Sequence, residues 1–107
     1  MRVNNKLNRI SDFYCTSCGH KGFPIIRKAG QEREPGHLKK LFCIYCNQEQ
    51  NMVEIKQGGK YNLEIFELEF HNGNFVNGER VKPYKQFLAD YYQEIEEKRG
   101  GGYHGDE

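Results

Sequence analysis

The sequence has no long hydrophobic run, and this absence argues against a membrane-spanning protein. No stretch approaches the roughly 20 apolar residues that a transmembrane helix needs. The basic segment from Met1 to Lys6 is not followed by an apolar run, so no signal peptide is expected. The expected location is therefore cytoplasmic, where disulfides are rare.

Recognisable catalytic motifs are also missing. The sequence shows no glycine-rich phosphate loop and no Ser, His and Asp motif of a hydrolase. Two groups of acidic residues in the second half are expected to lie on solvated faces. They are Glu64, Glu67, Glu69, Glu94, Glu96 and Glu97. The sequence therefore predicts a protein that is not an enzyme.

The chain is short and polar, which limits the size of its hydrophobic core. It has 107 residues, of which 36% are hydrophobic and 29% are charged. A domain of this size buries only a modest share of its surface. Seven Tyr and seven Phe compensate in part, because each aromatic ring can bury a large area. A fold this small usually needs disulfides or a metal as well.

The net charge of +1 conceals a difference between the two halves of the chain. Residues 1–60 contain eleven Lys and Arg against five Asp and Glu, a net charge of +6. Residues 61–107 contain five against ten, a net charge of −5. This asymmetry indicates two surfaces of opposite charge, although short segments also differ in charge by chance.

All the cysteines stand in two C-x-x-C pairs. They are Cys15, Cys18, Cys43 and Cys46. Two residues between the ligands of a pair allow a tight turn, and two such turns supply the tetrahedral set that Zn²⁺ prefers. Gly19 and Asn47 directly follow the pairs, and both residue types tolerate the positive φ that these turns need. The pattern therefore predicts one Zn²⁺ bound by the four sulfurs.

Other uses of four cysteines are less consistent with the sequence. Disulfides are disfavoured by the expected location, and a redox dithiol normally has one C-x-x-C beside a βαβ pattern. An iron–sulfur cluster stays open as an alternative. His20 and His37 are expected to be ordinary surface residues rather than ligands. Because four thiolates leave no open coordination position, the metal is expected to stabilise the fold and not to activate water.

The C-x-x-C-Gly turn, an insert of hairpin length and the second C-x-x-C resemble the zinc-ribbon proteins over about residues 12–57. The resemblance implies a small zinc-stabilised β-rich fold. Zinc ribbons occur in transcription factors, polymerase subunits, ribosomal proteins and replication proteins. Transcript-cleavage factors among them carry two adjacent acidic residues at the hairpin tip. Here Arg33 separates Glu32 from Glu34, so that activity is not expected.

Turn residues divide the chain into an N-terminal polar arm (1–11), the zinc ribbon (12–57), a helical appendage (61–99) and a flexible tail (100–107). Strands are expected over 23–28, 37–42 and 51–56. The first two are expected to form a hairpin across the polar turn 30–36. Segment 63–70 is compatible with a strand or a helix, and a helix is favoured, with Asn62 as its N-cap and Gly73 after its end.

An amphipathic C-terminal α-helix is expected to begin at Pro83, in its first turn, and to end at the three glycines from Gly100. Its aromatic stripe is expected to pack against the rest of the protein. The alternative is a partner-binding face, since Tyr-rich surfaces favour interfaces. The candidate partner-binding residues are Tyr84, Phe87, Tyr91 and Tyr92.

The segment between the cysteine pairs is rich in basic residues. Clustered cations bind phosphates, and an exposed Phe23 or Tyr45 can stack on a base. The candidate nucleic-acid-binding residues are Lys21, Arg27, Lys28, Arg33, Lys39 and Lys40. The alternative is that these side chains only solvate the ribbon.

Two functional hypotheses follow from these features. The first is a non-enzymatic zinc-ribbon module that associates with nucleic acid as an accessory factor in transcription or replication. The second is a protein-interaction adaptor or inhibitor of a larger machine such as a polymerase or nuclease. Its compact format also occurs among small accessory proteins of phages and mobile elements. No small-molecule substrate is inferred.

Overall fold

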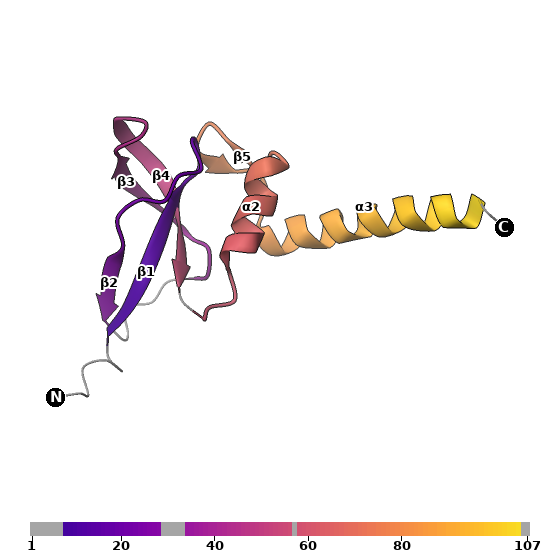
Figure 1. Ribbon diagram of the computed structural model, residues 1–107, viewed down its shortest axis with the longest axis horizontal. Helices are drawn as coiled ribbons and strands as arrows, with labels where there is room; N and C mark the ends of the chain where they lie inside the picture. Colours follow the sequence, from indigo (N-terminus) through magenta and orange to yellow (C-terminus); the bar gives the residue numbers. More distant parts are fainter. Residues whose placement is uncertain (1–7, 29–33, 57, 106–107) are drawn as a thin grey trace.

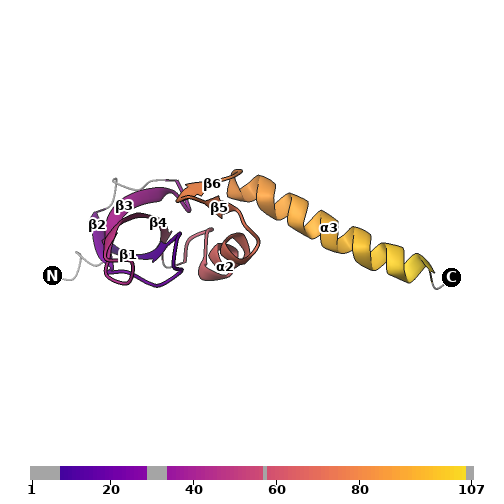
Figure 2. The ribbon, with the colours of Figure 1, turned by 90° about the horizontal axis from the view of Figure 1, so that it is seen from above.

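The protein folds into a curled antiparallel sheet with a second unit against one face (Figure 1). This second unit, residues 61–105, contains both helices and a short hairpin and is called the helical unit below. The computed structural model describes residues 8–28, 34–56 and 58–105. The elements are β1 (Asn8–Cys15), β2 (Ile25–Lys28), β3 (Leu38–Cys43), β4 (Gln48–Lys56), α2 (Leu63–His71), β5 (Phe75–Val76), β6 (Glu79–Arg80) and α3 (Tyr84–Gly105). The curl of the sheet is clearest from above (Figure 2).

The sheet has the strand order β2-β1-β4-β3, with antiparallel neighbours throughout. The expected hairpin between residues 23–28 and 37–42 was wrong, because β2 and β3 occupy opposite edges. Strand β1 pairs with both β2 and β4, and so stands between the two halves of the supposed hairpin. The true hairpin is β3–β4, which turns through the second cysteine pair.

Strand β1 includes residues 8–11, which the sequence placed in the polar arm. It buries alternate side chains of Ser11, Phe13 and Cys15. Because polar Ser11 occupies one of these core positions, the apolar alternation that marks a strand is interrupted. The remainder of the expected arm, residues 1–7, lies outside the described part of the chain.

The two faces of the sheet carry separate apolar clusters. Phe13 and Met52 pack with Cys15 and Cys43 in the first. In the second, Val53 and Ile55 pack against residues of the helical unit, chiefly Tyr61 and Phe66. Successive β4 residues point to opposite faces, so this strand contributes to both clusters, and its residues 52–55 are all buried.

Helix α2 begins and ends at the residues that the sequence indicated. The Asn62 side chain accepts a hydrogen bond from the Ile65 N–H at 2.9 Å, which confirms the N-cap. The helix ends at His71, and Gly73 follows with a φ of 80°. Its Phe66 ring lies 5.4 Å from the Tyr14 ring of β1 and so fixes the helix on the sheet.

A short hairpin, β5–β6, follows α2. The Asn77-Gly78 turn has positive φ at both residues, as its sequence predicts. The Gly78 carbonyl accepts a hydrogen bond of 2.5 Å from the Asn51 side chain on β4. The hairpin is thereby attached to the sheet.

A buried charge network joins the helical unit to the sheet. Glu69 is fully buried, so the expectation that it lies on a solvated face was wrong. Arg80 donates to both of its carboxylate oxygens, at 2.8 and 3.1 Å, and to the Gly36 carbonyl at 2.7 Å. Asn74 and the Tyr61 hydroxyl also donate to Glu69. Burial and the carboxylate raise the pKa of Tyr61 well above its usual range.

The contact between the helical unit and the sheet leaves no room for a side chain at position 36. Gly36 has a φ of 72°, and a Cβ atom there would lie 2.5 Å from the Tyr61 ring. Tyr61 in turn contacts Tyr84 of α3 edge-on, with 5.0 Å between ring centroids. The start of α3, the helical unit and the sheet therefore meet around one tyrosine.

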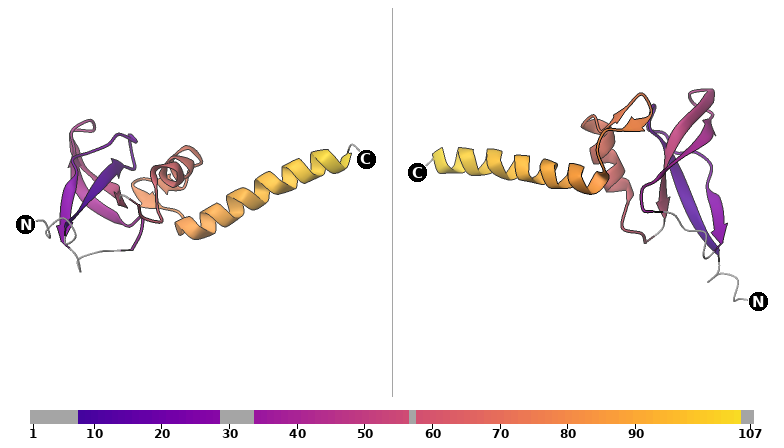
Figure 3. Two further views of the ribbon diagram at one scale, coloured as in Figure 1. Left: turned by 60° about the horizontal axis from the view of Figure 1, so that its bottom comes forward. Right: turned by 180° about the vertical axis from the view of Figure 1, so that it is seen from behind.

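Helix α3 begins at Tyr84, one residue after the expected start at Pro83, and runs to Gly105 instead of ending at Gly100. Glycine lowers helix stability but keeps its backbone N–H, whereas proline lacks this donor. Glycine therefore does not by itself end a helix. Both views in Figure 3 show α3 extending away from the sheet. None of the described helices is long and apolar enough to cross a bilayer.

We predict that Glu69→Gln lowers the free energy of unfolding by about 3 to 5 kcal/mol, because it leaves Arg80 without its buried counter-charge. Glu67→Gln is the matched control, since Glu67 is exposed on the same helix and should change stability by less than about 0.5 kcal/mol. Chemical denaturation measures both values. Equal effects of the two substitutions would show that the network does not stabilise the fold.

Candidate metal centre

The four cysteine sulfurs converge on one point. All four Sγ atoms lie within 4.8 Å of one another, as a metal ion requires. Between the pairs, Cys15 Sγ is 3.8 Å from Cys46 Sγ, and Cys18 Sγ is 3.6 Å from Cys43 Sγ. The four predicted ligands therefore form a group that could hold a metal ion.

Backbone turns hold the sulfurs in place. The N–H groups of Ser17 and Cys18 point to Cys15 Sγ at 3.3 and 3.5 Å, and the Cys46 N–H points to Cys43 Sγ at 3.4 Å. Such N–H···S contacts favour the thiolate form that binds metals. Each turn closes through a backbone bond to the first cysteine carbonyl, and the donors are the two positive-φ residues. They are Gly19 (φ 79°) and Asn47 (φ 60°).

One cysteine of each pair is the last residue of a strand in the sheet. Cys15 ends β1 and Cys43 ends β3, and both are almost completely buried against Phe13 and Met52. Both cysteine turns lie at the same end of the sheet, which is the upper end in Figure 1. The sulfur cluster is therefore continuous with one hydrophobic core of the protein.

The thiols differ in how readily they ionise. Burial raises the pKa of Cys18 to about 12. Burial and the contact with Cys43 also raise the pKa of Cys46. At Cys43, burial acts in the same direction, but hydrogen bonds from Cys46 and Cys18 outweigh it and lower the pKa to about 7. Four negative thiolates this close together need a cation to coexist.

The two histidines near the cysteines do not join the cluster. The His20 ring stacks on Tyr45, with ring centroids 4.0 Å apart. His37 was expected on the surface but is largely buried, and its Nε2 pairs with the carboxylate of Glu54. The other ring nitrogen, Nδ1, lies 3.1 Å from the Leu38 carbonyl, which can only accept a hydrogen bond.

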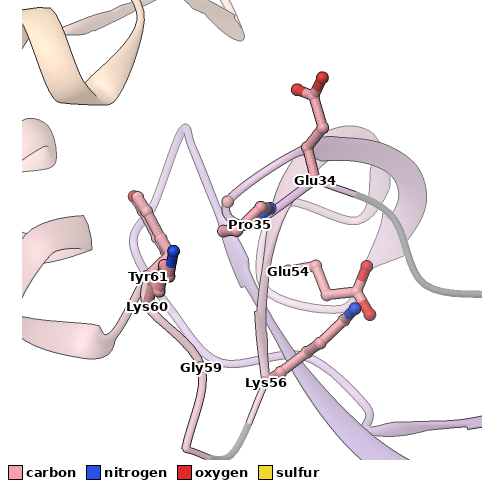
Figure 4. A pocket seen from close by; sticks show the side chains of 8 residues that line it. Glu34, Pro35, Glu54, Lys56, Gly59, Lys60 and Tyr61 are labelled. Atoms are coloured by element: carbon pink, nitrogen blue, oxygen red, sulfur yellow. The ribbon is translucent and has the colours of Figure 1, made fainter.

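Glu54 is a buried acid that sequence reasoning missed. It lies on β4, is 2% exposed, and accepts a hydrogen bond from Ser11 on β1. The signal was a single Glu within the apolar run Met52 to Ile55. Beside it is a cavity of about 40 Å³ that Tyr61 also lines, and the Glu54 and Lys56 side chains point toward one another there (Figure 4). This cavity has room for only a few water molecules.

A larger hollow of about 400 Å³ lies between the sheet and the start of α3. His37, Arg80 and Lys85 face it together with Glu34. Its volume is at the lower end of the range for ligand pockets. However, Arg80 and His37 already direct hydrogen bonds to buried carboxylates and carbonyls of the protein. The hollow therefore lacks a convergent set of available donors.

The candidate nucleic-acid-binding residues do not gather on one hairpin. Lys39 and Lys40 lie on edge strand β3 and, as neighbours on a strand, point to opposite faces. Lys21 precedes the opposite edge strand and pairs with Asp12 at 3.7 Å. The backbone of Arg27 and Lys28 is part of β2, but their side chains are not described. Arg33 lies outside the described residues.

The candidate partner-binding stripe on α3 divides into two parts. Tyr84 and Phe87 are packed, Tyr84 against Tyr61 and Phe87 at 7% exposure. Tyr91 is partly buried beside Phe87, whereas Tyr92 is 56% exposed. The stripe therefore serves the core at its start and faces solvent further along the helix.

We predict that metal affinity falls steeply as the pH falls. Cys18 and Cys46 have raised pKa values, so they are protonated at neutral pH and must each lose a proton to bind the metal. Two released protons correspond to a loss of at least about 100-fold in affinity per pH unit. Competition against a chromophoric chelator between about pH 6 and pH 8 measures how steeply the metal affinity depends on pH. An affinity independent of pH would contradict thiolate coordination.

Comparison with known proteins finds no family model, no curated protein and no solved structure that matches this chain. A function for the protein has therefore to come from the chemistry of its own residues.

Proposed function

We propose that the four cysteines bind one structural Zn²⁺ and that residues 12–57 form a zinc ribbon. A tetrahedral Zn²⁺ with Zn–S bonds of about 2.3 Å places its sulfurs about 3.8 Å apart. The sulfur separations between the two pairs are 3.8 and 3.6 Å, which agree with that value. The two positive-φ turns and the burial of Cys15 and Cys43 also support a structural site.

A structural role follows from the number of ligands. Four thiolates fill a tetrahedral coordination sphere, and a catalytic zinc keeps one position for water or substrate. The metal in this proposal organises the fold and does not take part in a reaction. A reducing compartment such as the cytoplasm keeps the thiols available for the metal.

We further propose that the sheet half associates with nucleic acid, as a non-enzymatic accessory factor in transcription or replication. The basic half of the chain contains the sheet, and the acidic half contains the helices. Residues 1–60, with eleven Lys and Arg against five Asp and Glu, include all four strands of the sheet. Residues 61–107, with five against ten, include both helices. A cationic surface attracts phosphates whatever the base sequence.

The observation that carries this proposal is the combination of cations and exposed rings on the sheet half. Phe23 and Tyr45 are 67% and 58% exposed, and Phe42 is 53% exposed. Lys21 and Lys40 are exposed on the same half. Cationic surfaces that also present aromatic rings are typical of proteins that bind single strands by stacking and phosphate contacts.

Anisotropy of a labelled single-stranded oligonucleotide, titrated between about 50 and 200 mM salt, tests the proposal. We expect Lys21→Gln with Lys40→Gln to weaken binding and to reduce the salt slope by about 0.7 for each lysine that contacts a phosphate. The matched control is Lys85→Gln with Lys98→Gln on α3, which removes the same charge from two exposed positions and should leave the slope unchanged.

Two results would contradict the proposal. Wild-type protein that does not bind at about 50 mM salt would exclude nucleic-acid association at meaningful affinity. Equal effects of the two double variants would show that binding follows total charge and is not located on the sheet half.

The second candidate function, a protein-interaction adaptor or inhibitor, is favoured by the exposed part of α3. Tyr92 and Ile95 are 56% and 36% exposed on the length of helix that extends from the body. A helix face of this kind can lie in a groove of a larger protein such as a polymerase or nuclease. Tyr92→Glu should then abolish recovery of a stoichiometric partner, and Glu96→Gln on the same helix should not.

A further inference from the structure

An aromatic pair spans the two cysteine turns. His20 lies two residues after Cys18, and Tyr45 lies between Cys43 and Cys46. Their rings are nearly parallel, at 17°, with centroids 4.0 Å apart. The two residues are far apart in the sequence and come from different turns, so the stack forms only when the turns are brought together.

The sulfur cluster brings them together. The His20 carbonyl accepts a hydrogen bond of 3.0 Å from the Cys15 N–H, which fixes its backbone beside the first turn. Sulfur atoms link the two turns, with Cys15 Sγ 3.8 Å from Cys46 Sγ and Cys18 Sγ 3.6 Å from Cys43 Sγ. Ordering of the rings by the metal site lowers the entropy cost of binding a ligand on them.

The stack is open to solvent. Tyr45 is 58% exposed and His20 is also exposed, so the pair retains ring surface that the protein does not cover. Lys21 directly follows His20, its side chain is 53% exposed, and its ammonium lies 3.7 Å from the Asp12 carboxylate. An open aromatic surface with a cationic residue next to it in the chain suits a planar group joined to a phosphate.

We propose that the His20–Tyr45 pair is a stacking platform for an unpaired base of single-stranded nucleic acid, and that Lys21, the residue after His20, contacts the adjoining phosphate. The proposal rests on the proposed nucleic-acid association, and it adds the position and the strand preference of that binding. Bases within a duplex are already stacked on each other, so an open platform favours single strands. Stacking depends little on base identity, so broad sequence tolerance is expected.

Substitution of Tyr45 tests the platform. Tyr45→Ala should weaken single-strand binding by about 10-fold or more, within the range found for loss of one stacked base. It should leave the salt slope unchanged, since no phosphate contact is lost. Tyr45→Phe keeps the ring and should bind as the wild type does. The matched control is Tyr92→Ala on α3, where the tyrosine is 56% exposed against 58% for Tyr45.

A direct stacking signal accompanies the affinity measurement. An oligonucleotide with one 2-aminopurine loses fluorescence when that base stacks on an aromatic ring. We expect wild type and Tyr45→Phe to quench it, and Tyr45→Ala with His20→Ala to leave it bright. Metal content and circular dichroism of each variant confirm that the fold is intact.

The outcomes separate the platform from the broader function. Salt-dependent binding by the wild type with no loss in Tyr45→Ala would overturn the platform and leave nucleic-acid association standing. Equal losses in Tyr45→Ala and Tyr92→Ala would also overturn it. No binding by the wild type would remove the proposed function, and the exposed rings would then be assigned to a protein partner.

Discussion

The fold depends on the convergence of four sulfurs from two turns that are remote in the sequence. Cys15 and Cys43 end β1 and β3, the two strands that flank β4, and belong to the same core cluster as Phe13 and Met52. In small zinc peptides, the free energy of metal binding, about 10 to 16 kcal/mol, is also free energy of folding. That is similar in size to the total stability of a typical domain, about 5 to 15 kcal/mol. A metal at this site would therefore determine whether the sheet folds.

A second constraint joins the sheet to the helical unit. Arg80 binds Glu69 and the Gly36 carbonyl at once, while Tyr61 covers Gly36 too closely for a side chain there. The pairing compensates both buried charges, so its loss costs more than its presence contributes. The network also holds the helical unit against the sheet. Each of these two parts carries one of the candidate binding surfaces. The exposed rings His20 and Tyr45 belong to the cysteine turns, and the exposed part of α3 extends from the helical unit (Figure 1).

Local features of this fold could be predicted from the sequence, and long-range pairings could not. The cysteine turns, the Asn62 cap and the start of α3 are set by residues within a few positions of one another. Strand β1 was missed because Ser11 occupies a core position, where Glu54 of β4 accepts its hydrogen bond. Glu69 was placed in solvent because its partner Arg80 lies eleven residues later, on the second strand of the β5–β6 hairpin. Which strands become neighbours depends on such pairings, so the hairpin across residues 30–36 was also wrong.

Zinc content measured together with folding tests the central claim most directly. Native mass spectrometry should find one zinc per chain, and hydrogen exchange should show protected amides throughout β1 and β4. Chelation should remove the zinc and expose both strands together, and Cys43→Ser should reproduce that state. A chain that holds no zinc, or that keeps β1 and β4 protected without it, would contradict the account.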